Sequence, residues 1–111
     1  NISVGNHVYL APNVIVNAVA DVFFCDEVMV GFNSVIVSGN HSLHADSFRF
    51  GPSISAPINI GCGSWIGANC TIVAGAVVPA RSLVAANSCF SGRNTDSGIY
   101  GGVPSKFIKH I

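Results

Sequence analysis

Residues 58–78, "INIGCGSWIGANCTIVAGAVV", carry a large aliphatic side chain at every sixth position, namely at Ile60, Ile66, Ile72 and Val78. This period matches neither the alternation of a β-strand nor the 3.6-residue turn of an α-helix. The same spacing continues in both directions, with a two-residue slip near residue 21 and an interruption at residues 42–59. Most of the positions are β-branched or aromatic, which favours strands over helices. The twelve positions are Val4, Leu10, Val16, Phe24, Val30, Ile36, Ile60, Ile66, Ile72, Val78, Val84 and Phe90.

A second feature repeats with the same period. The residue four places after each aliphatic position is small or valine in ten of the twelve cases, the exceptions being Asn40 and Asn94. The ten are Val8, Val14, Ala20, Val28, Ser34, Ser64, Cys70, Ala76, Ser82 and Ser88. The two features together are typical of a hexapeptide-repeat β-helix, in which three units close a triangular coil of about 18 residues. Coils of this kind stack about 4.8 Å apart through parallel backbone hydrogen bonds. The sequence therefore predicts an all-β protein, a parallel β-helix of about four coils, whose handedness does not follow from the spacing.

Residues 42–59 leave the six-residue register and contain Gly51, Pro52 and Pro57, which are turn-forming residues. We expect this segment to be a loop protruding from the β-helix rather than a domain boundary. Residues 1–95 are then one repeat domain, and residues 96–111 are a C-terminal tail. The chain opens directly on patterned sequence without a methionine, so we expect an N-terminal piece to be missing.

The charges are few and unevenly placed. Charged residues make up 9% of the chain and the net charge is zero, which argues against a nucleic-acid-binding surface. Four of the five cations, Arg81, Arg93, Lys106 and Lys109, fall in the last 31 residues. They are either the binding site of an anionic partner or ordinary solubilising charge. No apolar run approaches the ~18 residues of a membrane span and no signal peptide is visible, so a cytoplasmic protein is expected.

The four cysteines, Cys25, Cys62, Cys70 and Cys89, show no Cys-x-x-Cys spacing. We interpret them as small buried hydrophobic residues in a reducing compartment, rather than as disulfides or zinc ligands.

Four segments carry a resemblance to a known family: "VGFNSVIVSGNHS" (30–42), "APINIGCGSWIGANCTIVAGAVV" (56–78), "VAANSCFS" (84–91) and "YGGVPSKFIK" (100–109). In their order and spacing they resemble the hexapeptide-repeat acyltransferases, in the branch of maltose, galactoside and polysaccharide O-acetyltransferases. The resemblance covers nearly the whole chain. It implies a left-handed β-helix that forms a homotrimer, with acetyl-CoA as co-substrate in the groove between neighbouring subunits and no metal.

The resemblance also implies the catalytic residue. His41, in "SGNHS" at the root of the loop, corresponds to the family's general base, which takes a proton from the acceptor hydroxyl. The hydroxyl then attacks the thioester of acetyl-CoA directly, without a covalent enzyme intermediate. His44, three residues further on, is a weaker candidate for the acceptor site, and His7 and His110 are expected to be surface residues.

Further site residues follow from the same resemblance. Trp65, in the family's Trp-Ile-Gly, is expected to line the acceptor pocket or the pantetheine arm. Asn40 falls at an inward place of the repeat and either caps the last turn or orients His41. The asparagine that relatives place one coil before the catalytic histidine is here Asn13 or Asn17. Coenzyme A is expected to contact Ala68, Ala86, Arg93, Lys106 and Lys109.

Three alternatives stay open to different degrees. The same base could serve N-acetylation of an amino sugar, and a β-helix trimer could keep the fold without turnover. A zinc site like that of the β-helix carbonic anhydrases would need His7, His41 and His44 together. His7 and His41 occupy different places in the repeat and the close pair is only three residues apart, which argues against zinc.

Overall fold

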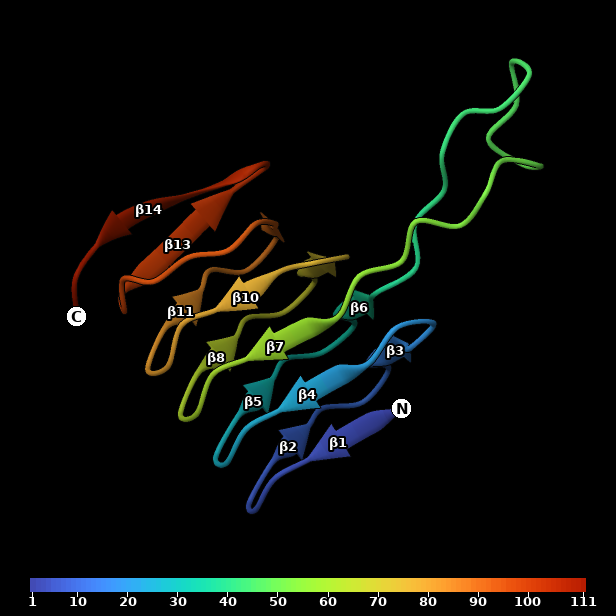
Figure 1. Ribbon diagram of the computed structural model, residues 1–111. Coiled ribbons are helices and arrows are strands. Elements are labelled where there is room, and N and C mark those ends of the chain that lie inside the picture. The colour runs from blue at the N-terminus through green and yellow to red at the C-terminus, as the bar shows by residue number, and fades with distance from the viewer.

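The computed structural model describes residues 1–111 and contains fourteen β-strands and no helix. Twelve strands form four coils of three. The first two coils contain β1 (Ile2–Val4), β2 (Tyr9–Leu10), β3 (Ile15–Asn17), β4 (Val22–Phe24), β5 (Met29–Val30) and β6 (Val35–Val37). The next two contain β7 (Ile58–Ile60), β8 (Trp65–Ile66), β9 (Thr71–Val73), β10 (Val77–Val78), β11 (Leu83–Val84) and β12 (Cys89–Phe90). The coils stack into a rod with the N-terminus at one end and the C-terminal strands at the other (Figure 1).

Each side of the rod is a sheet built from successive coils. The first side has the order β1-β4-β7-β10, and the third side has the order β3-β6-β9-β12. The second side, β2-β5-β8-β11, is extended by β13 (Ile99–Gly102) and β14 (Ser105–Lys109). Neighbouring coils pair in parallel, so Met29, Trp65 and Leu83 occupy equivalent places on the second side. The predicted parallel β-helix of about four coils is confirmed.

The aliphatic positions of the repeat form the interior. Nine of the twelve, from Phe24 to Phe90, have at most 2% of their surface exposed. Burial of a side chain of this size contributes about 1.5–3 kcal/mol, so this column is the main source of stability. The first coil of this chain packs against a neighbouring coil on one side only, and its Val4 and Leu10 are 54% and 40% exposed.

Serines at the small inward places link one coil to the next. The Ser34 hydroxyl donates to the Gly67 carbonyl (2.8 Å) and accepts from the Cys70 N–H (3.1 Å). The Ser64 hydroxyl likewise donates to the Pro79 carbonyl at 2.7 Å. A buried hydroxyl is tolerated when it is hydrogen-bonded, and here each one also satisfies main-chain groups at a corner where the ladder is interrupted.

The prediction that Asn40 occupies an inward place is wrong. Asn40 is exposed and the buried residue at this point is Ser38, because the chain leaves the coil at Ser38 to form the loop. Asn94, the other asparagine expected inward, is half-buried, and its amide donates to the carbonyls of Ser91 and Gly92.

The corners explain several polar residues of the repeat. The fourth place of the repeat adopts a left-handed conformation at nine of the corners, and His7 and Asn13 have φ of 58° and 65° there. Asparagine tolerates this region better than most residues. It fills the corner between the second and third sides in all four coils, as Asn13, Asn33, Asn69 and Asn87.

The interpretation of the cysteines is wrong for two of the four. Cys25 and Cys62 form a disulfide with Cα atoms 4.5 Å apart. Each follows the aliphatic residue of its own coil by one or two places, so both lie at the corner between the first and second sides. Cys70 is a buried free thiol that donates to the Ala85 carbonyl at 3.1 Å, and burial raises its pKa. Cys89 is free and half-buried.

The C-terminal tail closes the upper end of the rod. β13 pairs in parallel with β11, and β14 returns antiparallel to β13. Tyr100 is 2% exposed and packs edge-to-face against Phe90 and Phe107, with ring centroids 5.2 Å and 5.4 Å away. This stack covers the last layer of the interior. None of the chain forms a helix that is long and apolar enough to cross a membrane.

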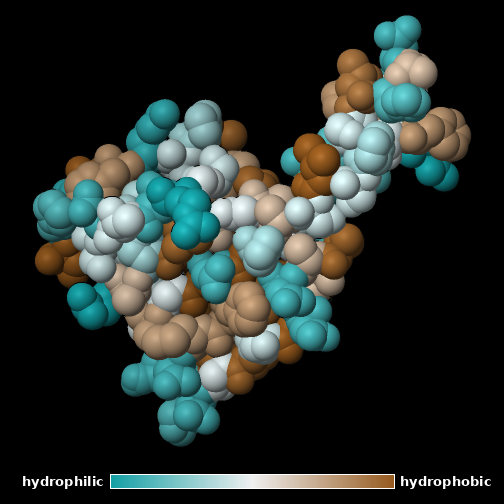
Figure 2. Space-filling view, in the orientation of Figure 1, coloured by the Kyte–Doolittle hydropathy of each residue, from teal (hydrophilic) through white to brown (hydrophobic).

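The protruding loop leaves the rod at the corner between the third and first sides, and extends well away from it (Figure 2). β7 begins at Ile58. The loop carries large exposed apolar side chains at Leu43, Phe48, Phe50 and Ile54. The Arg49 guanidinium lies 5.2 Å from the centroid of the Phe50 ring.

Candidate functional site

His41 lies in a two-stranded neck at the base of the loop. The outgoing strand pairs antiparallel with the returning strand, with His41 opposite Ser53. The Ile54 N–H donates to the Asn40 carbonyl at 3.0 Å, and the N–H and hydroxyl of Ser42 both donate to the Pro52 carbonyl. The neck therefore holds the backbone of His41 from both sides.

The imidazole of His41 is exposed and makes no hydrogen bond within the chain. The side-chain oxygen of Asn40 accepts the backbone N–H of His41 at 2.9 Å. Asn40 thus fixes the main chain at this position rather than the ring. A ring nitrogen left free in this way can accept a proton from a bound hydroxyl.

Of the two candidates Asn13 and Asn17, Asn17 lies nearer the neck. It ends β3 opposite Val37, and its side-chain oxygen lies 3.3 Å from where a Cβ on Gly39 would be. Asn13 instead lies at the corner between the second and third sides, where its left-handed backbone accounts for the residue type. His44 is exposed further out on the loop and pairs with Ser47.

Trp65 and Ala68 lie together on the second side of the rod. They line a hollow of about 170 Å³ with Tyr9, Met29 and Phe32. Trp65, which is 48% exposed, also borders a second hollow of about 470 Å³ that contains Arg81, Leu83, Ile99 and Ile111. The indole therefore separates two concave surfaces.

Ala86 belongs to the same region. The Asn87 N–H donates to the Ala68 carbonyl at 3.0 Å, so Ala68 and Ala86 occupy equivalent places in successive coils. A Cβ on Gly67 would lie 2.8 Å from the Ala86 backbone nitrogen. Small residues are required here because the coils approach closely.

The predicted cations are divided between two regions. Lys106 and Lys109 are both exposed on β14, and neither forms an ion pair. The backbone of Arg93 pairs in parallel with that of Val77, at the corner between the third and first sides. The two lysines share the second side of the rod with Trp65, whereas Arg93 lies at the corner from which the loop emerges.

The predicted residues thus form two groups within one chain. One group lies at or next to the loop corner: Asn17, Asn40, His41, His44 and Arg93. The other group lies on the second side and at its corner with the third side: Asn13, Trp65, Ala68, Ala86, Lys106 and Lys109. One chain does not bring the two groups together. The largest hollow, about 660 Å³ around Phe23 and Val77 on the first side, contains no predicted residue.

No group of three or more His, Cys, Asp or Glu side chains comes together to hold a metal ion. His7 lies at the turn between β1 and β2, whereas His41 lies in the loop between β6 and β7. Sequence reasoning missed Ser38, which is buried at the base of the neck; the two-residue slip near residue 21 was the available signal.

Comparison with known proteins places this geometry in context. No family model matches the sequence. The whole chain aligns with the galactoside O-acetyltransferase of Escherichia coli at 27% identity and with the sophorolipid acetyltransferase of Starmerella bombicola at 35%. The chain covers 55% and 43% of these proteins, so it spans about half the length of the curated relatives it matches.

Solved structures give the same picture. A hexapeptide-repeat acetyltransferase from Vibrio cholerae in complex with acetyl-CoA aligns with a TM-score of 0.89 at 30% identity, over 98% of this chain and 60% of that one. A maltose O-acetyltransferase from Clostridium difficile aligns at 0.88 and 25%, over 99% of this chain and 59% of that one. The chain is therefore similar in sequence and in structure to hexapeptide-repeat acetyltransferases, and its fold is their left-handed β-helix.

Proposed function

We propose that this chain is the catalytic β-helix of an acetyl-CoA-dependent O-acetyltransferase that acts on a hydroxyl of a sugar, a polysaccharide unit or a small alcohol. The observation that carries the proposal is the exposed, unpartnered imidazole of His41, held by its main chain in the neck of the loop. Relatives named galactoside O-acetyltransferase and sophorolipid acetyltransferase support this acceptor class.

In the proposed reaction a ring nitrogen of His41 takes the proton of the acceptor hydroxyl. The oxygen attacks the thioester carbonyl, and the tetrahedral adduct collapses by breaking the C–S bond. The thiolate of coenzyme A leaves and is protonated by the imidazolium, which returns His41 to its starting state. General-base catalysis of this kind contributes roughly 10²- to 10⁴-fold.

The proposed active site is shared between copies of the chain. His41 and Trp65 lie at different edges of one rod, so a second copy is needed to complete the site. A homotrimer with its sites at the subunit interfaces satisfies this requirement and covers exposed apolar side chains such as Tyr9 and Met29. Light scattering that found a stable monomer at micromolar concentration would remove the shared site.

Coenzyme A is proposed to lie along the second side of the rod. Ala68 and Ala86 place small side chains along this groove, and Lys106 and Lys109 offer unpaired cations to the phosphates. The acetyl-CoA complex of the Vibrio cholerae relative supports the choice of acyl donor. Asn13 or Asn17, Asn40, His44 and Trp65 are proposed to contact the acceptor, and Arg93 to contact the cofactor.

A direct assay tests the function. Purified protein is incubated with acetyl-CoA and a panel of sugars, glycolipids and alcohols, and the released thiol is measured. Turnover with a hydroxyl acceptor supports the proposal. Turnover with amino sugars alone would assign N-acetylation. If no acceptor in the panel raised thiol release above the rate of the His41→Ala variant, the chain would be a non-catalytic trimer.

A cytoplasmic site of action is part of this proposal, and the Cys25–Cys62 pair bears directly on it. Disulfides persist in oxidising compartments and are rare in the cytosol. Alkylation of thiols in intact cells before lysis distinguishes the two locations. A cytoplasmic protein would carry both residues as free thiols in the cell and form the bond only on later oxidation, whereas a pair that is already bonded in intact cells would contradict this location.

A further inference from the structure

The first coil is two residues longer than the third, and the extra residues lie at the corner from which the loop emerges one coil later. Residues paired between the first two coils, Ile2 and Val22, are 20 apart in sequence, whereas Asn59 and Val77 are 18 apart. The extra residues fall between β3 and β4. Their main-chain groups cannot all be satisfied by the regular coil-to-coil ladder.

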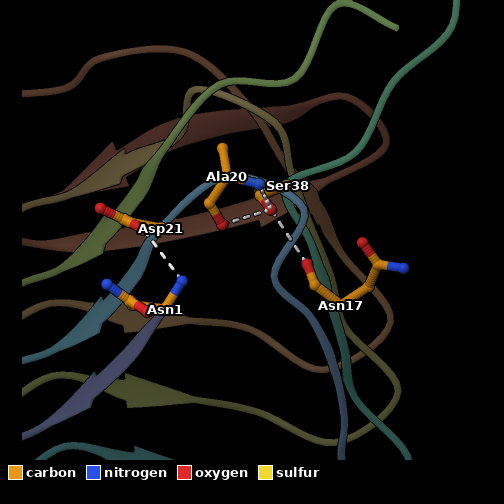
Figure 3. A network of polar contacts seen from close by, with 5 residues as sticks. All are labelled: Asn1, Asn17, Ala20, Asp21 and Ser38. Atoms are coloured by element: carbon orange, nitrogen blue, oxygen red, sulfur yellow. Dashed lines mark hydrogen bonds and ion pairs between the residues drawn. The ribbon is translucent and has the colours of Figure 1, made fainter.

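The hydroxyl of Ser38 satisfies this corner. Ser38 Oγ accepts the Ala20 N–H at 2.9 Å and lies within donating distance of the carbonyls of Ala20 (2.8 Å) and Asn17 (3.0 Å). The Ser38 N–H also donates to the Asn17 carbonyl at 3.0 Å. Figure 3 shows the hydroxyl between Asn17 and Ala20. Ser38 is completely buried.

Ser38 is also the last residue of the coil before the neck. Its carbonyl accepts the Ala56 N–H of the returning strand at 3.1 Å. One residue therefore bonds to the preceding coil through its hydroxyl and N–H, and to the returning strand of the neck through its carbonyl. His41 follows three residues later, and its position depends on how the neck is attached to the rod.

We propose that Ser38 is a positioning residue for His41: its hydroxyl fixes the neck to the Asn17–Ala20 corner and so sets where the imidazole lies. This inference rests on the proposed function. Without the hydrogen bonds of the Ser38 hydroxyl, the neck can shift relative to the Asn17–Ala20 corner, although His41 itself is unchanged. A displacement of about 1 Å at a catalytic group can cost on the order of 10²-fold in rate.

The chain offers a matched control in Ser34. It lies in the same coil, is completely buried, and its hydroxyl also donates to a carbonyl and accepts a main-chain N–H. Its partners, Gly67 and Cys70, lie at the corner between the second and third sides, away from the neck. Ser34→Ala and Ser38→Ala therefore remove the same chemistry, and only one of them is expected to move His41.

The experiment compares kcat, the KM for acetyl-CoA and amide hydrogen exchange in both variants, below their unfolding temperatures. Ser38→Ala is expected to lower kcat about tenfold or more with little change in KM, and to speed exchange at the Ile54 and Ala56 amides. Ser34→Ala is expected to leave kcat within about twofold and the neck amides protected. Ser38→Thr, which keeps the hydroxyl, should restore much of the lost kcat.

Equal loss of kcat in the Ser34 and Ser38 variants, or an unchanged kcat in Ser38→Ala, would overturn the proposal. If Ser38→Ala does not fold, Ser38→Cys replaces it, since a thiol of similar size forms only weak hydrogen bonds. Ser38→Cys must then show a lower kcat with little change in the KM for acetyl-CoA. His41→Ala in the same assay separates the two claims. Full turnover of His41→Ala would refute the general base, whereas the exchange comparison still decides whether Ser38 holds the neck.

Discussion

The side-chain oxygen of Asn40 accepts the backbone N–H of His41 at 2.9 Å, so an exposed amide holds the main chain of the proposed base while its ring stays free. Asparagine side chains can hydrogen-bond to neighbouring backbone groups in this way. The contact gives Asn40 a role that differs from orienting the imidazole through a ring nitrogen.

The first prediction concerns this contact. Asn40→Asp keeps an oxygen acceptor for the His41 N–H, whereas Asn40→Ala removes it. Because one such hydrogen bond contributes about 0.5–1.5 kcal/mol, Asn40→Ala should lower kcat by roughly two- to tenfold, and Asn40→Asp should stay nearer to wild type. Steady-state kinetics on both variants measure this difference. Equal losses in the two would show that the amide NH₂ of Asn40, and not its oxygen, matters.

The second prediction concerns the Cys25–Cys62 disulfide. It joins two residues that are 37 positions apart and encloses the whole protruding loop, and a crosslink of this span contributes about 2–4 kcal/mol. The Cys25→Ala/Cys62→Ala variant should unfold at correspondingly lower denaturant concentration.

Reductant provides the control for this prediction. Dithiothreitol should lower the stability of the wild type toward that of the double variant, and should leave the double variant unchanged. A wild type whose unfolding curve does not respond to reductant would show that the two sulfurs do not stabilise the fold by bonding.

The third prediction concerns the lysines of β14. Lys106→Ala and Lys109→Ala should each raise the KM for acetyl-CoA, with a smaller effect on kcat, because they remove binding that is equal in the ground and transition states. The effect should weaken at high salt, since exposed charges are screened. Arg49→Ala, which removes an exposed cation of the loop, is the control and should leave the KM for acetyl-CoA unchanged. Wild-type KM values in both lysine variants would place the phosphates elsewhere.

Much of the fold was predictable because the interior imposes its period on the sequence. A side chain at Ile60 or Ile72 fills a layer only if the next one comes six residues later, and this requirement is visible along the chain. The left-handed corners also leave a trace, since Asn and Gly recur at the fourth place. The first coil departs from the burial pattern because a predicted inward position, such as Val4, is buried only when a coil lies on both sides of it.

The site was less predictable, for two physical reasons. Hydrogen bonds such as those of Ser38 join residues about one coil apart, and the slip near residue 21 conceals which residues face each other. The loop has the same effect on the Cys25–Cys62 pair, since two residues at one corner are 37 positions apart in sequence. His41 was identified through its resemblance to a family motif, while the neck that holds it depends on pairing that no local pattern encodes.

The most direct test of the account is kcat of His41→Ala, measured with His44→Ala alongside it. Both histidines are exposed on the same loop, so the two variants remove the same chemistry three residues apart. His41→Ala should keep the oligomer and the affinity for coenzyme A, because its imidazole supports no part of the interior, yet lose roughly 10²- to 10⁴-fold in kcat. His44→Ala should cost far less. Full turnover in folded His41→Ala, or its loss in His44→Ala alone, would contradict the assignment of His41 as the general base.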